Sequence, residues 1–284
     1  MTITLQKLPS SLSLYVGAAG TARRKPKGKV TLPALEARLD NVRADAKQLA
    51  GYNKVCGFRD SELLPITFPQ VMVAGLHMHL MMQPEFPFPL LGLVHLRNSI
   101  VQKRPLRADE NYSVMVKIGE SREIRIGLEF DLITEFSLGD DVLYRAATTI
   151  LHRSGSTSKG GSKPRPETVD SVLSDYLTFD APADTGRRYA AVGKDYNPIH
   201  LWAATAKLFG FPRAIAHGMW SLARCTALTQ DNLGREPREL HVQFKQPLLL
   251  PGKVAVKFNN KDGAVNFALI ARNASKTHLT GSLR

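Results

Sequence analysis

The sequence predicts an α+β chain made of two tandem copies of one unit, in which a curved antiparallel sheet wraps around a buried helix. Sequence patterns recur in the same order in the two halves, and each half has one apolar helix-like run followed by strand-like segments. A segment rich in Gly, Ser, Pro and Lys separates the halves. A helix that is apolar almost all round has to be buried, and a sheet that curves around it provides that burial.

Three pairs of segments show the duplication. "YNKVC" is echoed by "YAAVG", the helix-like run "FPQVMVAGLHMHLMM" by "FPRAIAHGMWSLARCTAL", and "IVQKRPL" by "VQFKQPL". The segment 153–168 has no apolar periodicity and is typical of a linker. We therefore expect an N-terminal extension at 1–29, a first unit at 30–152, the linker at 153–168 and a second unit at 169–284.

Each unit is predicted to have one buried helix followed by four strands. The helices are expected at 68–82 and from Gly218 onward, and turn residues such as "KDG" separate the strand-like segments. The predicted strands are 92–102, 112–119, 122–137 and 141–152 in the first unit, and 238–246, 253–260, 264–272 and 276–284 in the second. Pairing of the two exposed sheet edges would join the units into one continuous sheet.

Composition indicates an ordinary globular protein. Of its 284 residues, 43% are hydrophobic and 22% charged, and no run of 18 apolar residues is present, so we expect no membrane insertion. The apolar stretch "LSLYVGAAGTA" is preceded only by Lys7 and followed by the basic "ARRKPKGK", the reverse of a secretory signal. Cys56 and Cys225 are expected to be reduced thiols, and the sequence predicts a cytoplasmic protein.

The formal net charge of +13 favours anionic partners. Nucleic acid, a phosphorylated cofactor and an acidic carrier protein are all anionic partners of this kind. Alternatively, the positive charge only keeps the protein in solution. Only 7% of the residues are aromatic, and no segment interleaves aromatic residues with Lys and Arg as single-strand-binding proteins do. We therefore expect no nucleic-acid partner.

The segment "DYNPIH" concentrates groups suited to acid/base chemistry. Asn197 is a favoured N-cap and Pro198 fits the first helical position, so we predict a helix that ends at Gly210. His200 then lies in the first turn and Asp195 just outside the cap. This holds an imidazole close to a carboxylate, as general acid/base catalysis through a shared water requires. The alternative is a turn-forming Asp with an incidental His.

The segment "RAIAHGMW" adds a hydrogen-bond donor. At the predicted start of the buried helix, the Gly218 N–H is free to bind a developing oxyanion. The alternative is that His217 is a core histidine beside a glycine chosen for close packing. Together, an acid/base pair and an amide donor supply what is needed to polarise a thioester carbonyl while a proton moves at its α carbon.

"DYNPIH" followed by "FGFPRAIAHGM" resembles the signature of the MaoC-like dehydratases, which include R-specific enoyl-CoA hydratases. With "PFPLLGLVHLRNSI" in its first half, the chain is similar to the double-hotdog 3-hydroxyacyl-thioester dehydratases of bacteria over about residues 30–284. The resemblance implies a hotdog fold in each half and an active site in the second half only. The implied reaction is reversible syn addition of water to a trans-2-enoyl thioester of CoA or acyl carrier protein, giving the (R)-3-hydroxyacyl thioester. No metal or redox cofactor is implied.

The resemblance also implies roles for individual residues. Asp195 and His200 match the catalytic dyad, Gly218 matches the oxyanion donor, and Asn197 matches the residue that orders the loop. Thr226 falls where the family often has a small hydroxyl side chain near the dyad.

Two further residues beside the dyad are expected to contribute to substrate binding, His217 and Lys194. The family usually has glycine at the position of Lys194. If that position requires a positive φ, lysine costs about 1 kcal/mol of strain. Two alternatives exist for this side chain, which either reaches a substrate phosphate or faces solvent.

The first unit has no Asn-Pro-x-His sequence after "YNKVC". The resemblance implies that this unit shapes a tunnel for the acyl tail. Its helix is rich in methionine, which adapts to varied chains but is equally suited to an ordinary core; the residues are Met72, Met78, Met81 and Met82. His77 and His79 are two apart on a predicted helix and therefore point to different faces, so we expect no shared metal ion.

Two other functions stay open at this point. A non-catalytic acyl-thioester-binding protein would not need the dyad. A hotdog thioesterase would share the fold, but Asp-x-Asn-Pro-x-His is not the thioesterase pattern. The whole chain, with its two paired units, can also pair with a second copy, so a homodimer is a possible assembly.

Overall fold

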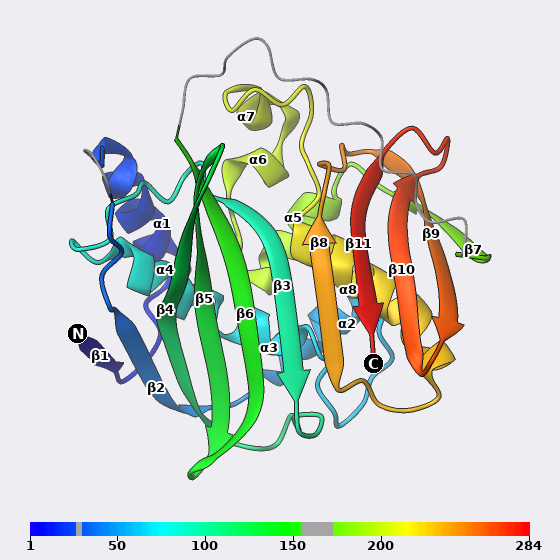
Figure 1. Cartoon of the computed structure of the whole chain (residues 1–284), viewed down its shortest axis with the longest axis horizontal. Helices are drawn as coiled ribbons and strands as arrows, with labels where there is room; N and C mark the ends of the chain where they lie inside the picture. The colour runs from blue at the N-terminus through cyan, green and yellow to red at the C-terminus, as the bar shows by residue number, and fades with distance from the viewer. Residues whose placement is uncertain (27–29, 155–172) are drawn as a thin grey trace.

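The computed structural model describes residues 1–26, 30–154 and 173–284, and in this part of the chain eleven strands form a single sheet (Figure 1). The strand order is β1-β2-β4-β5-β6-β3-β8-β11-β10-β9-β7. The strands are β1 (Thr2–Leu5), β2 (Glu36–Val42), β3 (Val94–Gln102), β4 (Tyr112–Ile124), β5 (Gly127–Leu138), β6 (Asp141–Arg153), β7 (Asp175–Ala181), β8 (Glu239–Phe244), β9 (Gly252–Lys261), β10 (Ala264–Ala271) and β11 (Thr277–Leu283). The predicted α+β class is confirmed.

The predicted duplication is visible in the sheet. The first unit has the order β2-β4-β5-β6-β3, and the second has the equivalent order β7-β9-β10-β11-β8. The two units meet where β3 pairs antiparallel with β8, from Arg97 opposite Gln243 to Val101 opposite Glu239. The two predicted sheets therefore join edge to edge, as expected from the sequence. The predicted linker lies outside the described residues from position 155 onward.

The helices lie on one face of the curved sheet (Figure 1). They are α1 (Ser11–Gly20), η1 (Thr21–Arg23), α2 (Ala46–Cys56), α3 (Phe68–Met72), α4 (Ala74–Met82), α5 (Thr185–Gly193), α6 (Pro198–Leu201), α7 (Ala203–Lys207), α8 (Gly218–Thr229) and η2 (Gln230–Leu233). The repeated "Y…V" motifs form α2 and α5, and their tyrosines Tyr52 and Tyr189 pack together with ring centroids 6.1 Å apart. Both rings are buried members of the main hydrophobic core, so the duplicated motif contributes to the packing of that core.

The strand predictions were incomplete in two respects. Each unit has a fifth strand before its helices, β2 and β7, which the sequence analysis did not select. Both carry exposed polar and charged positions, as strands near a sheet edge commonly do. The predicted strand 122–137 is split, because the chain reverses at Arg125 and Ile126, and Gly127 begins β5 with a φ of 149°. A Cβ at Gly127 would lie 2.0 Å from the carbonyl oxygen of His152, so only glycine fits directly after this turn.

Two predicted helices are interrupted. The first breaks at Val73, which has φ −113° and ψ 7°. The second breaks at Trp202, which is extended with φ −140° and ψ 149°. If the helix continued past Trp202, the carbonyls of α6 would have to accept hydrogen bonds from the next turn. Two of them already have other donors: Ile199 O accepts from Ile215 N at 3.1 Å, and Leu201 O accepts from Arg187 Nη1 at 3.1 Å. Tertiary hydrogen bonds therefore replace the helical ladder at this point.

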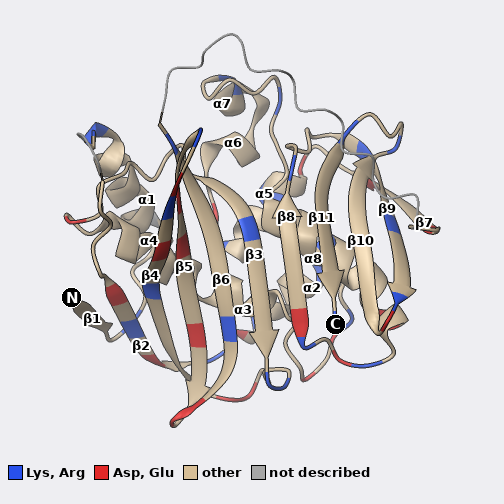
Figure 2. Ribbon diagram, in the orientation of Figure 1, with Lys and Arg blue, Asp and Glu red and all other residues tan. Residues whose placement is uncertain are grey.

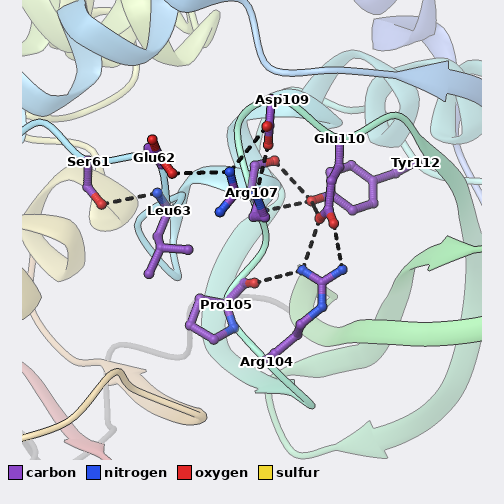
Figure 3. A network of polar contacts seen from close by, with 9 residues as sticks. All are labelled: Ser61, Glu62, Leu63, Arg104, Pro105, Arg107, Asp109, Glu110 and Tyr112. Carbon is purple, nitrogen blue, oxygen red and sulfur yellow. Dashed lines mark hydrogen bonds and ion pairs between the residues drawn. The ribbon is translucent and has the colours of Figure 1, made fainter.

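The connection between β3 and β4 is held by a polar network (Figure 3). The guanidinium of Arg104 donates to both carboxylate oxygens of Glu110, at 2.9 and 2.7 Å. The Tyr112 hydroxyl accepts from Arg107 N at 2.8 Å and donates to Glu110 Oε2 at 2.6 Å. A bidentate pair of this kind fixes the geometry of a loop. The loop follows β3 and begins with the last residues of the repeated segment "IVQKRPL".

The predicted N-terminal extension is part of the fold in its described residues. β1 pairs in parallel with β2, and α1 packs against α4. Within the described part of the chain, no helix is both long and apolar enough to cross a bilayer.

Candidate active site

Six of the seven residues selected from the sequence line one cavity of about 730 Å³. They are Lys194, Asp195, Asn197, His200, His217 and Gly218. Thr226 does not line the cavity: its side chain is fully buried on α8, with no hydrogen-bond partner for Oγ1 among the described residues. The hydroxyl residue of α8 that does line the cavity is Ser221, five residues earlier in the sequence. The expected place of Thr226 near the dyad stays a prediction.

The loop that carries Asp195 begins with a left-handed residue. α5 ends at Gly193, and Lys194 follows with φ 56° and ψ 20°, its N–H bound to Ala190 O at 2.9 Å. This position does have the positive φ that favours glycine, at which lysine is strained by about 1 kcal/mol. The Lys194 Nζ donates to Ala191 O at 3.0 Å, which ties the side chain back to α5.

The Asp195 carboxylate is oriented through one of its two oxygens. Oδ1 accepts from the backbone N–H of Asn197 at 3.1 Å and from the hydroxyl of Tyr15 at 3.1 Å. The Asn197 side chain accepts from Ile199 N at 3.4 Å, so it is the predicted N-cap of α6. Oδ2 makes no hydrogen bond within the described residues; His217 Nε2 is 3.7 Å away.

His200 is held in one tautomer. Its Nδ1 lies 2.8 Å from the carbonyl oxygen of Ile215, and since a carbonyl can only accept, Nδ1 carries the proton. Nε2 therefore keeps its lone pair. Burial lowers the pKa of His200, although Asp195 and the Ile215 carbonyl oppose the shift, so the ring is neutral near pH 7.

His217 contacts both members of the dyad. Its ring stacks on that of His200 with centroids 3.7 Å apart and planes at 27°, and its Nε2 donates to the backbone carbonyl of Asp195 at 3.0 Å. Burial, with a smaller effect of His200, lowers the pKa of His217 to about 3. His217 is therefore a neutral side chain that fixes the main chain of Asp195 and the plane of His200.

The Asp195 carboxyl is ionised at neutral pH. Burial works against its ionisation, but His217, His200, the Asn197 amide and the Tyr15 hydroxyl together hold its pKa below the usual value. Its side chain stays 45% exposed although the surrounding loop is packed, because it lines the cavity.

Two glycines allow the close approach of these elements. Gly218 is the first residue of α8, so its N–H lies outside the helical hydrogen-bond ladder. A Cβ on Gly218 would lie 3.0 Å from Cε1 of Phe244, tighter than most real contacts. Gly186, in α5, lies against the backbone of His200, where a Cβ would be 1.9 Å from the carbonyl oxygen. Gly186 was not predicted from the sequence, because its contact with His200 arises only in the tertiary structure.

The first unit supplies much of the apolar wall of the cavity. Met78, Met81, Leu132 and Ile150 line it, whereas Met72 and Met82 do not. The histidines of α4 have separate partners: His77 Nε2 lies 2.8 Å from Thr134 Oγ1, and His79 Nε2 lies 3.2 Å from the Gln83 amide nitrogen. The expected divergence of these two side chains is confirmed.

Asp195, His200 and His217 are the one group of three possible metal ligands found among the described residues, with ligand atoms within 4.8 Å of one another. Each imidazole already commits one nitrogen to a backbone carbonyl. The remaining atoms are Asp195 Oδ2, His200 Nε2 and His217 Nδ1, the last of which is buried with no hydrogen-bond partner among the described residues. The first two are equally the atoms of a general acid/base pair that acts through one water.

Comparison with known proteins shows the family to which the chain belongs. The family model described as "MaoC like domain" matches residues 161–281. The chain is 34% identical over 278 residues to 3-hydroxyacyl-thioester dehydratase X of Mycobacterium tuberculosis, covering 97% of this chain and 98% of that protein.

Solved structures show the same relationship. The crystal structure of HtdX of Mycobacterium tuberculosis is 32% identical with a TM-score of 0.75, covering 88% of this chain and 99% of that one. A MaoC-like dehydratase from Phytophthora capsici has a TM-score of 0.73 at 18% identity, covering 89% of this chain and 95% of that one; at this identity the likeness concerns the fold alone. With its two hotdog units joined through β3 and β8, the chain belongs to the MaoC-like dehydratases, a family of hydro-lyases.

Proposed function

We propose that this protein catalyses the reversible hydration of trans-2-enoyl thioesters to (R)-3-hydroxyacyl thioesters, with Asp195 and His200 as its acid/base pair. The observation that supports this most strongly is the pair of open acid/base atoms at the cavity. Asp195 Oδ2 and His200 Nε2 make no hydrogen bond within the described residues, and the two side chains offer atoms within 4.8 Å of each other. One water can bridge such a separation.

In the hydration direction the bridging water loses a proton as its oxygen bonds to C3 of the enoyl group. The ionised Asp195 and the neutral His200 accept that proton and return one to C2, so that one water is added across the double bond. Because one dyad delivers both the oxygen and the proton, both arrive on the same face, and the addition is syn. Dehydration is the reverse sequence.

The thioester oxygen carries negative charge while C2 is being protonated. The Gly218 N–H, free at the start of α8, is suited to stabilise this charge. Asn197 would order the loop, and His217 would hold the Asp195 main chain. No metal or redox cofactor has a part in this sequence of steps.

We assign the acyl tail to the first unit, residues 30–152, and catalysis to the second, 169–284. The methionine and aliphatic side chains of α4, β5 and β6 line the cavity beside the dyad and suit a hydrocarbon chain. The first unit has no dyad of its own in its sequence.

The group that carries the acyl thioester is proposed to be CoA or acyl carrier protein, both of which are anionic. Lys194 and Arg153 line the cavity. No Asp or Glu occurs from Tyr196 to Ala216, a segment that includes α6 and α7 and carries Lys207 and Arg213 (Figure 2). Exposed basic side chains such as Lys207 and Arg213 attract phosphates or acidic helices.

Two further assignments extend the sequence analysis. We place the activity in the cytoplasm, where the buried free thiols of Cys56 and Cys225 would remain reduced. We also propose the homodimer that the sequence left open as one possible assembly, which gel filtration with light scattering would test.

The function is tested by incubating the purified protein with a short and a long trans-2-enoyl-CoA and with an enoyl carrier protein. Loss of the enoyl-thioester absorbance and chiral analysis of the product are the readouts. We expect the (R)-3-hydroxyacyl thioester with the thioester bond intact. Release of a free thiol without hydration would support the thioesterase alternative, and saturable binding without turnover would support the binding protein.

A further inference from the structure

The N-terminal helix α1 reaches the catalytic loop of the second unit. The Tyr15 hydroxyl donates to Asp195 Oδ1 at 3.1 Å and accepts from the backbone N–H of Tyr196 at 2.5 Å. The Tyr15 ring also packs edge-on against that of Tyr196, with centroids 5.9 Å apart and planes at 86°. Tyr15 lines the same cavity as the dyad, although 180 residues separate it from Asp195 in the sequence.

These bonds determine which oxygen of Asp195 is free. Oδ1 is occupied by two donors, the Asn197 amide and the Tyr15 hydroxyl. The Asn197 amide alone leaves the carboxylate able to turn about its χ2 bond, a soft torsion for aspartate. A second donor from another element removes that freedom and leaves Oδ2 for the water and the substrate.

α1 is itself anchored to the first unit by Arg24. Its guanidinium donates to the last carbonyls of α4, with Nη1 2.8 Å from Met81 O and Nη2 2.6 Å from Met82 O and 2.9 Å from Gln83 O. A cation at a helix C-terminus satisfies carbonyls that have no partner within the helix. The Thr21 hydroxyl, next to α1, accepts from Leu90 N at 3.0 Å. Tyr15 is thus presented by a fixed element.

We propose that Tyr15 is a positioning residue of the active site, which holds Asp195 Oδ1 so that Oδ2 faces the reacting water. The N-terminal segment then completes the catalytic site across the unit boundary. The inference rests on the proposed function in assigning Asp195 to catalysis. The hydrogen bond itself has a consequence for Asp195 that does not depend on turnover.

A hydroxyl that donates to a carboxylate stabilises the ionised form, so its removal should raise the carboxyl pKa. Several other groups act on the same carboxyl and remain in place when the hydroxyl is removed. They are His200 and His217, the Asn197 amide, Tyr189 of α5 and His95 of β3. Lys194 and Tyr196, which precede and follow Asp195 in the chain, also remain in place. A change on removing the hydroxyl therefore reports the Tyr15 contact.

The first test is a ¹³C NMR titration of the aspartate carboxyls in the native protein and in Tyr15→Phe, with the Asp195 signal identified by its loss in Asp195→Asn. Phenylalanine keeps the ring and its contact with Tyr196. We expect the Asp195 carboxyl to titrate at a higher pH in Tyr15→Phe, whether or not any thioester is turned over. An unchanged titration would overturn the proposal while leaving the proposed function intact.

The second test is the pH profile of hydration. For Tyr15→Phe we expect kcat to fall roughly 10- to 100-fold, as for loss of a hydrogen bond to a charged group, with KM little changed and the acid limb moved to higher pH. The control is Tyr176→Phe in β7, where the tyrosine is 50% exposed. Arg24→Met, which loosens α1 but keeps the hydroxyl, should move the acid limb the same way by a smaller amount. Native kcat and acid limb in Tyr15→Phe would overturn the proposal.

Discussion

Replacing Gly186 by alanine should disable the dyad without touching a catalytic side chain. The new Cβ would lie 1.9 Å from the carbonyl oxygen of His200 and 2.9 Å from its carbonyl carbon. An ordinary contact begins near 3.4 Å, so the backbone of α6 has to move away from α5 by about 1.5 Å. The His200 ring cannot follow freely, because its Nδ1 is bound to Ile215 O at 2.8 Å.

A displacement of about 1 Å at a catalytic group typically costs about 10²-fold in rate, and we expect a loss of at least this size in kcat for Gly186→Ala. Overpacking should also lower the free energy of unfolding by about 1 to 3 kcal/mol. The assay is enoyl-thioester hydration together with a urea unfolding curve. Gly20→Ala is the control, since a Cβ at that position has no atom within 4 Å. Native rate and stability in Gly186→Ala would refute the packing of α5 on α6 described above.

Three further predictions concern strain, pH and metal. Lys194→Gly should relieve the left-handed strain and raise the free energy of unfolding by up to about 1 kcal/mol, measured by urea unfolding; a decrease would contradict the strain. Stability should fall as the pH drops from 6.5 towards 4, because burial lowers the pKa of His77 and of His95 to about 4 and the unfolded chain therefore binds more protons in this range. A thermal melting temperature that increases as the pH is lowered from 6.5 to 4 would contradict the conclusion that these two imidazoles are buried and neutral. Dialysis against EDTA should leave hydration unchanged, and a loss restored by a divalent metal would instead identify Asp195, His200 and His217 as ligands.

The features that could be predicted from the sequence are those set by neighbouring residues. The Asn197 cap and the start of α8 at Gly218 depend on local capping geometry, and both lie where the sequence places them. The duplication was predictable because the same motifs recur in order, and the equivalent strand orders confirm it. A position within one helix does not show which side faces the cavity, and the lining includes Ser221 but not Thr226.

The features that could not be predicted depend on contacts between distant segments. The break at Trp202 follows from hydrogen bonds that Ile215 and Arg187 make to α6 carbonyls. The approach of α1 to Asp195 has no signal in the sequence "LSLYVGAAG", which was assigned to an extension. In the same way, the positive φ of Lys194 is evident only once α5 is seen to end there.

The proposed mechanism requires Asp195 and His200 to act together on the water that adds to the enoyl thioester. The most direct measurement is the initial rate of enoyl-CoA hydration by the native protein, Asp195→Asn and His200→Gln, with thermal melting to confirm that each variant is folded. We expect both folded variants to lose roughly 10²- to 10⁴-fold in kcat, as for removal of a general acid or base. Hydration at the native rate by either folded variant would contradict the account.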